Sequence, residues 1–291
     1  MSNKFATSAS NGDHPVPGTL IDNDTLELVE IVDTSGYGIV YRAVETFIKP
    51  NKKPKTFTVK VFSCTDGKRS NHIREASLQY HVSGHPGIIS LYQVLEEDNH
   101  MYFVMYYANS KDLFHQIDQR CYLGNDHVIK SVFKQLLDAV DHLHCMGVYH
   151  RDLRPENILC LENGLRVAIS EFGSATTDRR SVEFRTRSIY HSPECQAGRY
   201  ASDAYSPMAT DVWSLGIILL NMVTGRNPWE SATADDPIFQ AYGRSPFNFF
   251  PSVLPISTAF NKLMIQVLDP NWKTRLSLHH FRQKIESIST F

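Results

Sequence analysis

Hydrophobic and polar positions alternate in short segments along the first third of the chain. Alternation of this kind, with turn residues between the segments, is typical of β-strands. It predicts five strands, which begin at Leu26 and continue at Ile39–Tyr41, Phe57–Phe62, Ile88–Leu95 and Met101–Tyr107. A glycine-containing turn joins the first two strands, and Ser70–Val82 has the longer period of a helix.

Beyond about residue 108 the apolar positions follow a helical period. They recur at helical spacing through 128–143, with Asn125 or Asp126 as a possible N-cap and Gly147 as the stop. The chain then continues with two short strands at 158–161 and 165–169, a polar segment at 171–192, and helices interrupted by a Pro- and Phe-rich stretch at 244–255.

This order of elements predicts an α+β chain with two lobes that meet near residue 108. The expected boundaries are a small N-lobe at 21–108 and a larger, mainly helical C-lobe at 109–291. Residues 1–20 are rich in Ser, Asn, Gly and Pro and are expected to form a disordered leader. The apolar run at 212–223 is too short to span a bilayer and is predicted to be a buried core helix.

Composition narrows the class of protein. The chain has 291 residues, of which 42% are hydrophobic, and a formal net charge of -2, so we expect a globular protein with no nucleic-acid or membrane partner. The five cysteines are scattered and form no Cys-x-x-Cys pair, which favours reduced core thiols in an intracellular protein. The N-terminus lacks the apolar run of a signal peptide.

The strongest chemical signal is the segment His150–Asn157, which reads His-Arg-Asp-Leu-Arg-Pro-Glu-Asn. It places the Asp152 carboxylate five residues before the Asn157 amide, with Pro155 between them. A carboxylate can orient a hydroxyl and accept its proton, and an amide oxygen can ligate Mg²⁺, which are two requirements of phosphoryl transfer. A turn that only bonds its own backbone is the alternative.

A second signal is a lysine inside an apolar strand. Lys60 lies between Val59 and Val61, where a buried ammonium needs an anion beside it. Glu75 in the following predicted helix is in the range where such a partner would be needed. The alternative is a lysine whose ammonium reaches solvent.

Taken in order, these segments resemble a eukaryotic protein kinase domain from about Leu26 to Ile288. The resemblance is carried by Lys60, Glu75, His150–Asp152, Glu171–Gly173, Ser192–Glu194, Asp211–Gly216 and Arg275. Further segments are similar to fungal Ser/Thr kinases of the meiotic-repressor and nutrient-response type, namely Val82–Pro86, Tyr190–Cys195, Asn227–Ala232 and Asp236–Tyr242.

The resemblance implies a bilobal kinase fold, with five antiparallel strands and one helix in the N-lobe. It implies transfer of the ATP γ-phosphate to a protein Ser or Thr, by a monomer in the cytoplasm or nucleus. Lys60, fixed by Glu75, would hold the α- and β-phosphates. The other residues implied around the nucleotide are Gly36, Gly38, Val32, Val40, Thr58, Met105, Tyr107 and Leu159.

The resemblance also assigns the chemistry of the C-lobe. Asp152 would be the catalytic base and Arg154 a cation near the γ-phosphate. Asn157 and Glu171 would hold Mg²⁺, or Mn²⁺. Asp112 would contact the ribose, although a helix N-cap is an equally good interpretation. Glu156 would meet a basic substrate side chain or remain solvated, Asp211 would brace the catalytic loop, and Glu194 would pair with Arg275.

Several positions depart from the family pattern. Of three usual glycines only Gly38 is in place, Asp33 and Ser35 occupy the other two positions, and Gly36 is displaced by one. Glu171 replaces an Asp, and its extra methylene suits octahedral Mg²⁺ poorly. Arg154 replaces a Lys, and Arg187 replaces a Thr that bonds the catalytic loop, a role left to Thr186 or Ser188. The alternative function is therefore a pseudokinase that binds nucleotide or partners without transferring phosphate.

Overall fold

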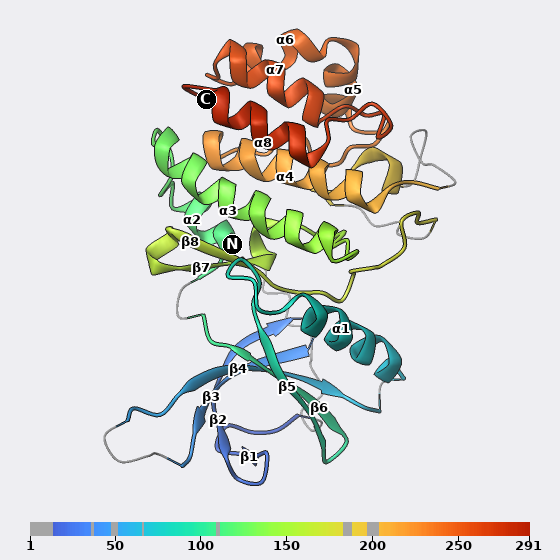
Figure 1. The fold of residues 1–291 in the computed structure, drawn as a ribbon. Coiled ribbons are helices and arrows are strands. Elements are labelled where there is room, and N and C mark those ends of the chain that lie inside the picture. The colour runs from blue at the N-terminus through green and yellow to red at the C-terminus, as the bar shows by residue number, and fades with distance from the viewer. Residues whose placement is uncertain are drawn as a thin grey trace, which may run out of the picture. The chain divides into compact units, whose positions relative to one another are not determined.

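The computed structural model describes residues 14–35, 38–47, 52–65, 67–108, 111–182, 188–196 and 204–291. The chain forms two compact units. Unit 1 comprises Met1–Ala76 and Ser90–Tyr107, and unit 2 comprises Ser77–Ile89 and Ala108–Phe291. The strands of the large sheet belong to unit 1 and most helices belong to unit 2 (Figure 1).

Unit 1 is built on an antiparallel sheet in the order β1-β2-β3-β4-β6-β5. Its strands are β1 (Leu20–Ile21), β2 (Leu26–Ser35), β3 (Gly38–Glu45), β4 (Thr56–Ser63), β5 (Leu91–Glu97) and β6 (His100–Tyr106). The five predicted strands are confirmed. The short edge strand β1 was not predicted, because two residues carry no recognisable alternation.

Two boundaries differ from the sequence prediction for a tertiary reason. Leu20, placed in the predicted leader, pairs with Glu27 of β2; residues 1–13 of that leader lie outside the described residues. Ile88 and Ile89, predicted to begin β5, belong to unit 2, where the Ile89 N–H donates to the carbonyl of Ile169 at 2.9 Å.

The two faces of the sheet carry different residues. One face forms a buried cluster that includes Tyr41, Val59, Val61 and Val104. On the other face, Phe62 at the end of β4 stacks on His72 of α1 (Arg69–Val82), with ring centroids 4.1 Å apart. Helix α1 is therefore joined to the sheet on the face that does not carry this cluster.

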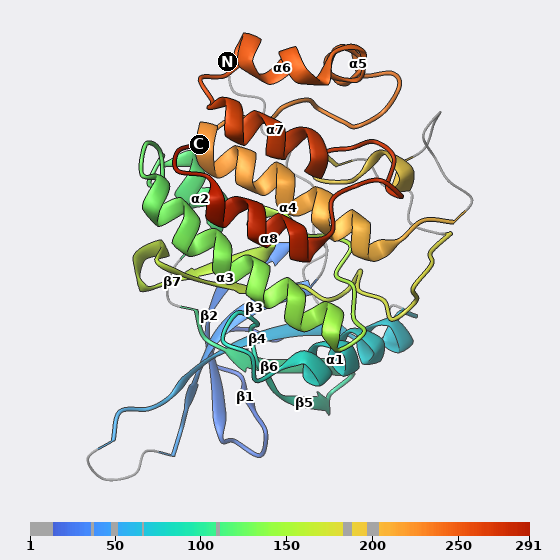
Figure 2. The same cartoon turned by 45° about the horizontal axis from the view of Figure 1, so that its top comes forward.

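Unit 2 is mainly helical, and its helices pack in layers. Helix α3 lies beside α4 and α8, and α7 lies against α4, α6 and α8 (Figures 1 and 2). Its elements are α2 (Leu113–Asp118), α3 (Asp126–Cys145), β7 (Ile158–Leu161), β8 (Arg166–Ile169), α4 (Pro207–Thr224), α5 (Pro237–Arg244), α6 (Pro246–Val253), α7 (Thr258–Val267) and α8 (Leu278–Ser287), with short 3₁₀ turns at Pro155–Asn157, Glu162–Gly164 and Pro193–Cys195.

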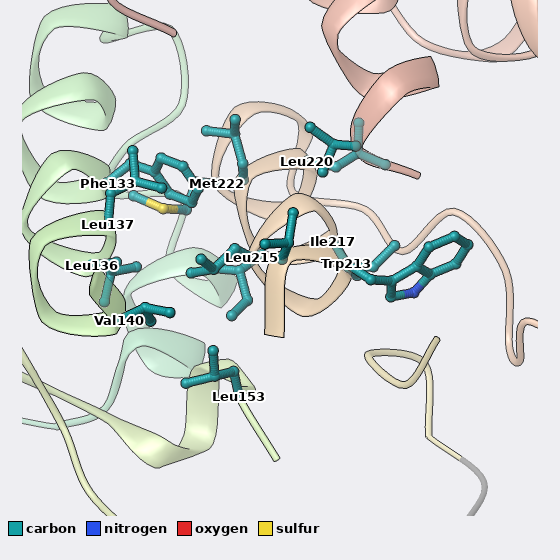
Figure 3. Packing of buried hydrophobic residues seen from close by; sticks show 14 of the residues in the cluster. Phe133, Leu136, Leu137, Val140, Leu153, Trp213, Leu215, Ile217, Leu220 and Met222 are labelled. Atoms are coloured by element: carbon teal, nitrogen blue, oxygen red, sulfur yellow. The ribbon is translucent and has the colours of Figure 1, made fainter. Parts of the chain in front are cut away.

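The core of unit 2 lies between α3 and α4. Figure 3 shows Phe133, Leu136 and Val140 of α3 pointing toward Leu215 of α4. Leu153 of the segment His150–Asn157, the predicted catalytic loop, lies at the edge of this cluster. Leu153 is fully buried. The catalytic loop is therefore anchored in the core by an apolar side chain next to Asp152.

Helix α4 is the central helix of unit 2. By length and composition alone it could cross a membrane, but 78% of it is buried inside the protein, as is typical of the core helix predicted for this run. Asn125 caps α3 by accepting from the Val128 N–H at 3.1 Å, and Gly147 follows the helix with a positive φ of 72°, in agreement with the predicted start and stop.

The predicted interruption at 244–255 is wrong, because α6 is helical there despite Pro251. Proline removes the N–H that would bond to the carbonyl of Phe247, four residues earlier. The side-chain amide of buried Asn261 donates to that carbonyl at 2.8 Å instead. A residue from α7 therefore makes the bond that the local sequence lacks.

The prediction of core thiols holds for only part of the cysteine set. Cys160 and Cys195 are buried, and burial raises the pKa of each thiol to about 12. Cys64 is partly exposed, and Cys121 and Cys145 are exposed, so for these the prediction is wrong. All five are free thiols.

Candidate functional site

In unit 1 the structure brings Lys60 and Glu75 together. The Lys60 Nζ donates to Glu75 Oε1 at 2.9 Å, and the side chains are only 2% and 8% exposed. Lys60 Nζ also lies 4.8 Å from the centre of the Phe62 ring. A buried ammonium with a carboxylate beside it is held in one position, so it can present its positive charge to a phosphate group without reorganising.

The strand register places further predicted residues beside Lys60. Val40 of β3 pairs directly with Lys60, and Thr58 pairs with Met105 of β6. Directly paired residues, and residues two apart on a strand, share a face of the sheet. Val40, Thr58 and Met105 therefore lie on the face of Lys60, opposite the apolar cluster of Tyr41 and Val59.

Other members of the predicted nucleotide set are less enclosed within unit 1. Val32 lies at a β-bulge of β2 and is 58% exposed, and Asp33 beside it is exposed as well. Tyr107 follows the end of β6 and is partly buried. Gly36 lies outside the described residues. The nucleotide contacts that the resemblance implies for Val32, Tyr107 and Gly36 remain predictions.

Gly38 has two structural reasons for being glycine. Its φ is +122°, and a Cβ built on it would lie 2.7 Å from the carbonyl oxygen of Val61 in β4. Both the backbone conformation and the close approach of β4 exclude a side chain. The nucleotide contact that the resemblance implies for Gly38 remains a prediction.

In unit 2 the catalytic loop is held by one carboxylate from α4. Asp211 accepts hydrogen bonds from the backbone N–H of His150 at 3.0 Å and of Arg151 at 2.8 Å, and from His144 Nε2 at 2.9 Å. Its side chain is fully buried. Arg151 has a positive φ of 65°, a conformation that costs energy for a residue with a side chain. The prediction that Asp211 braces the loop is confirmed.

Asp152 has a protein contact at each carboxylate oxygen. Asn157 Nδ2 donates to Oδ2 at 3.1 Å, and His191 Nε2 lies 3.4 Å from Oδ1. Burial by itself raises the pKa of the Asp152 carboxyl, but the contact with His191 and the nearby His150 and Arg154 outweigh it, so the pKa lies below its ordinary value. Asp152 is therefore a carboxylate at neutral pH, as a base must be.

The register of β7 and β8 brings Asn157 close to Glu171 in the fold. Ile158 pairs with Ile169, so the residues just outside this pair lie at the same end of the ladder. The N–H and hydroxyl of Ser170 both donate to the carbonyl of Asn157, at 2.9 and 3.0 Å. Glu171 follows Ser170 directly. Asn157 and Glu171, fourteen positions apart in sequence, are therefore close together in the fold.

The donor chemistry at this end of the ladder fits a hard cation. Asn157 uses its amide nitrogen for both hydrogen bonds to Asp152, to the carbonyl at 2.9 Å and to Oδ2, which turns its amide oxygen away from Asp152. Glu171 adds carboxylate oxygens. Oxygen ligands of this kind suit Mg²⁺ and Mn²⁺. Among the described residues no cluster of three His, Cys, Asp or Glu forms another metal site.

Glu171 occupies this position in a left-handed backbone conformation, with φ +64°. Asp and Asn enter that region more readily than Glu does, because their short side chains bond locally. The replacement of Asp by Glu at this position therefore has a backbone cost as well as a change in reach. The fully buried His150 supports the segment, donating to the Ser170 carbonyl at 2.9 Å with its ring 5.2 Å from that of Phe172.

Arg154, predicted to be a cation near the γ-phosphate, is held by Glu156. The guanidinium donates through Nε at 3.1 Å and through Nη2 at 2.8 Å to the two carboxylate oxygens. The side chains are 35% and 33% exposed. This two-bond pair fixes the plane of the guanidinium and partly offsets its charge. It also gives Glu156 a partner within the protein, which neither prediction for that residue included.

Asp112 and Leu159 are brought together by an isolated antiparallel bridge. Asp112 Oδ1 accepts from the backbone N–H of His115 at 2.8 Å and caps α2, so the N-cap interpretation is confirmed. The ribose contact implied for Asp112 and the nucleotide contact implied for Leu159 remain predictions.

The end of the polar segment is fixed to α4. Arg275 donates to both oxygens of Glu194, at 2.7 and 2.9 Å, and the two side chains are 0% and 2% exposed. Ser214 Oγ donates to the carbonyl of Tyr190 at 2.8 Å, and Ser192 Oγ donates to Thr210 Oγ1 at 3.2 Å. The predicted Glu194–Arg275 pair is confirmed.

One residue beside the base was missed by sequence reasoning. His191 was read only as part of the segment Tyr190–Cys195, yet its ring lies against Asp152. The two residues are 39 positions apart, and no spacing rule connects them. A histidine in the polar segment that follows Glu171 was the only signal available, and it pointed to no particular partner.

Comparison with known proteins agrees with this geometry. The chain belongs to the protein kinase domain family, which it matches over residues 27–285. It is 37% identical, over 88% of its own length, to the negative regulator of sexual conjugation and meiosis of Schizosaccharomyces pombe. It is also 35% identical to serine/threonine-protein kinase ksp1 of the same yeast over 76% of its length, and 30% identical to serine/threonine-protein kinase SKS1 of Saccharomyces cerevisiae over 87%.

The chain spans 58%, 49% and 53% of the lengths of these three relatives. The similarity therefore concerns the kinase domain and leaves the remainder of each relative without a counterpart here. Membership of the family implies ATP and a divalent metal as the general requirements of the site, and proteins as substrates. The expected kinase fold and its fungal resemblance are confirmed.

Proposed function

We propose that this chain is an active protein serine/threonine kinase, which transfers the γ-phosphate of ATP to a Ser or Thr hydroxyl of a protein. The observation that carries the proposal is the state of Asp152. Its side chain is 14% exposed, on a loop whose backbone is held by Asp211 and whose next residue, Leu153, is buried in the core. The names of ksp1 and SKS1 support Ser/Thr as the acceptor.

The residues of unit 2 supply the proton chemistry. Asp152 orients the acceptor hydroxyl and takes its proton as the new bond to the γ-phosphorus forms and the bond from that phosphorus to the bridging oxygen of ADP breaks. The low pKa of Asp152 means that it is ionised before the substrate arrives. His150 and Asp211 hold the backbone of this loop: the His150 ring bonds to the Ser170 carbonyl and accepts from the Asp152 N–H at 3.3 Å, and Asp211 accepts from the N–H groups of His150 and Arg151.

The remaining residues act by position and charge. Lys60, oriented by Glu75, binds the α- and β-phosphates. Asn157 and Glu171 would hold the divalent cation, whose chemistry is to neutralise charge on the transferred phosphoryl group. We propose Mn²⁺ as an effective alternative to Mg²⁺, because the longer Glu171 side chain suits a slightly larger ion. Arg154 adds positive charge that is reduced by its pair with Glu156.

The test is phosphotransfer from radiolabelled ATP to a generic Ser/Thr protein substrate, with Mg²⁺ and with Mn²⁺. Wild-type protein should transfer phosphate, and Asp152→Asn should lose transfer by about 1,000-fold or more while its melting temperature stays close to that of wild type. No turnover by the wild type with either metal would overturn the proposal in favour of a pseudokinase. Turnover that persists in Asp152→Asn would show that the base is wrongly assigned.

A second variant tests the metal assignment. Glu171→Asp shortens the side chain and lowers the backbone cost of a non-glycine residue at φ +64°. It should raise the Mg²⁺-supported rate about tenfold, with a smaller gain for Mn²⁺. Glu162→Asp, at an exposed positive-φ glutamate away from the site, is the matched control and should leave the rate unchanged. An unchanged rate in Glu171→Asp would contradict this account of the metal site.

A further inference from the structure

The polar segment that follows Glu171 contributes one side chain to the catalytic base. His191 Nε2 lies 3.4 Å from Asp152 Oδ1, and the two side chains are 3% and 14% exposed. The other oxygen of Asp152 accepts from Asn157 Nδ2. The carboxylate is thus bracketed by two nitrogens from different segments, one on each oxygen.

The ring of His191 is carried by a rigid piece of backbone. The His191 N–H donates to the carbonyl of Ser188 at 3.1 Å, and its own carbonyl accepts from Gln196 Nε2 at 2.6 Å. On either side, the carbonyl of Tyr190 and the hydroxyl of Ser192 are bonded to α4. The backbone that carries the imidazole is therefore held on both sides of His191.

Both partners of this contact depend on the same helix. Within five residues of α4, Asp211 holds the backbone before Asp152, while Thr210 and Ser214 hold the backbone around His191. A helix is stiff over one turn, so α4 fixes the position of the backbone next to Asp152 relative to the backbone around His191.

We propose that His191 is a positioning residue that holds the Asp152 carboxylate in the orientation needed to receive the acceptor proton. The proposal rests on the proposed kinase function and adds to it a contact that the resemblance does not assign. The family resemblance assigns such contact with the catalytic loop to a Thr, which is Arg187 here and lies outside the described residues. His191 approaches Asp152 from the same segment.

The contact of His191 Nε2 with Oδ1, at 3.4 Å, favours one orientation of the carboxylate. Without it, Asp152 keeps the bond from Asn157 but gains freedom to rotate about that bond. Its reactive oxygen would then point correctly for only part of the time. A small misplacement of a catalytic group lowers the rate of the chemical step and leaves ground-state binding of ATP largely unaffected.

The first test compares His191→Leu with His191→Gln. Leucine keeps apolar bulk and removes the donor, whereas glutamine places an amide N–H near the position of Nε2. We expect kcat to fall about 10- to 100-fold in His191→Leu with KM for ATP within about twofold of wild type, and to recover to within about fivefold in His191→Gln. His142→Leu, which removes a half-buried histidine of α3, is the control and should leave kcat unchanged.

The second test does not depend on activity. The imidazole signals are measured by NMR in protein with ¹⁵N-labelled histidine, and the signal of His191 is assigned by its loss in His191→Gln. This signal should shift in Asp152→Asn and stay in place in the control Asp141→Asn. An unshifted signal, or a wild-type kcat in His191→Leu, would overturn the positioning role. A wild type without turnover but with a shifted signal would overturn the kinase proposal and leave the contact established.

Discussion

Substitution of Asp211 by Asn tests how firmly α4 holds the catalytic loop. The carboxylate accepts three hydrogen bonds, at 2.8, 2.9 and 3.0 Å, from Arg151, His144 and His150, and the side chain is fully buried. Asparagine has the same shape but only one acceptor oxygen. Whichever way its amide is turned, at least one backbone N–H of the loop faces an N–H₂ group and loses its acceptor.

The magnitude follows from these contacts. A buried donor without an acceptor costs about 1–3 kcal/mol, and hydrogen bonds to a charged group contribute about 1 kcal/mol more than neutral ones. We therefore expect the free energy of unfolding to fall by about 2–5 kcal/mol. Phosphate transfer should fall as well, because Arg151 is held in its positive-φ conformation by the same carboxylate.

Tryptophan fluorescence in urea is a suitable assay, since all three tryptophans, Trp213, Trp229 and Trp272, belong to unit 2. Their signal reports unfolding of the unit that contains Asp211. Asp141→Asn on the exposed side of α3 is the control, with an expected change below about 0.5 kcal/mol. A loss of less than about 1 kcal/mol in Asp211→Asn would refute the view that this carboxylate braces the loop.

Two further predictions concern buried carboxylates of unit 2. Arg275→Met leaves Glu194 buried without its cation and should lower the free energy of unfolding by about 3–5 kcal/mol, measured by thermal unfolding followed by circular dichroism. Adding Glu194→Gln should restore part of this loss. Full additivity of the two changes would argue against a coupled pair. Asp236 accepts from four backbone N–H groups, including those of Ile238 and Phe239. Burial raises the pKa of the Asp236 carboxyl, but these hydrogen bonds outweigh burial, so the pKa in the folded protein lies below that in the unfolded chain. The carboxylate therefore stabilises the fold above the unfolded pKa, and this stabilisation is lost as pH falls through the folded pKa. Asp236→Ala should therefore lower the free energy of unfolding by about 1–2 kcal/mol at pH 7 and by less below about pH 4. A loss that is constant over that pH range would contradict a stabilising role of the ionised Asp236 carboxylate.

Helices α3 and α6 differ in whether the local sequence pattern is sufficient to predict them. Helix α3 has an apolar stripe, a capping Asn125 and a terminal Gly147, so its limits follow from residues within the helix. Helix α6 contains Pro251, which by local rules ends a helix. It persists because Asn261, ten residues further along the chain, supplies the missing donor. No local pattern contains that information.

Some features of the candidate site likewise follow from the local sequence, and others depend on the tertiary structure. The sequence alone determined the order of the motifs, the pairing of Lys60 with Glu75, and the closeness of Asp152, the predicted base, to Asn157. These features depend on short spacings or on one charge that must be neutralised in an apolar strand. The pairing of β7 with β8 places Glu171, which the resemblance assigns to the metal, close to Asn157. Only the tertiary structure decided that His191 faces the base, because that contact depends on how α4 holds two separate segments.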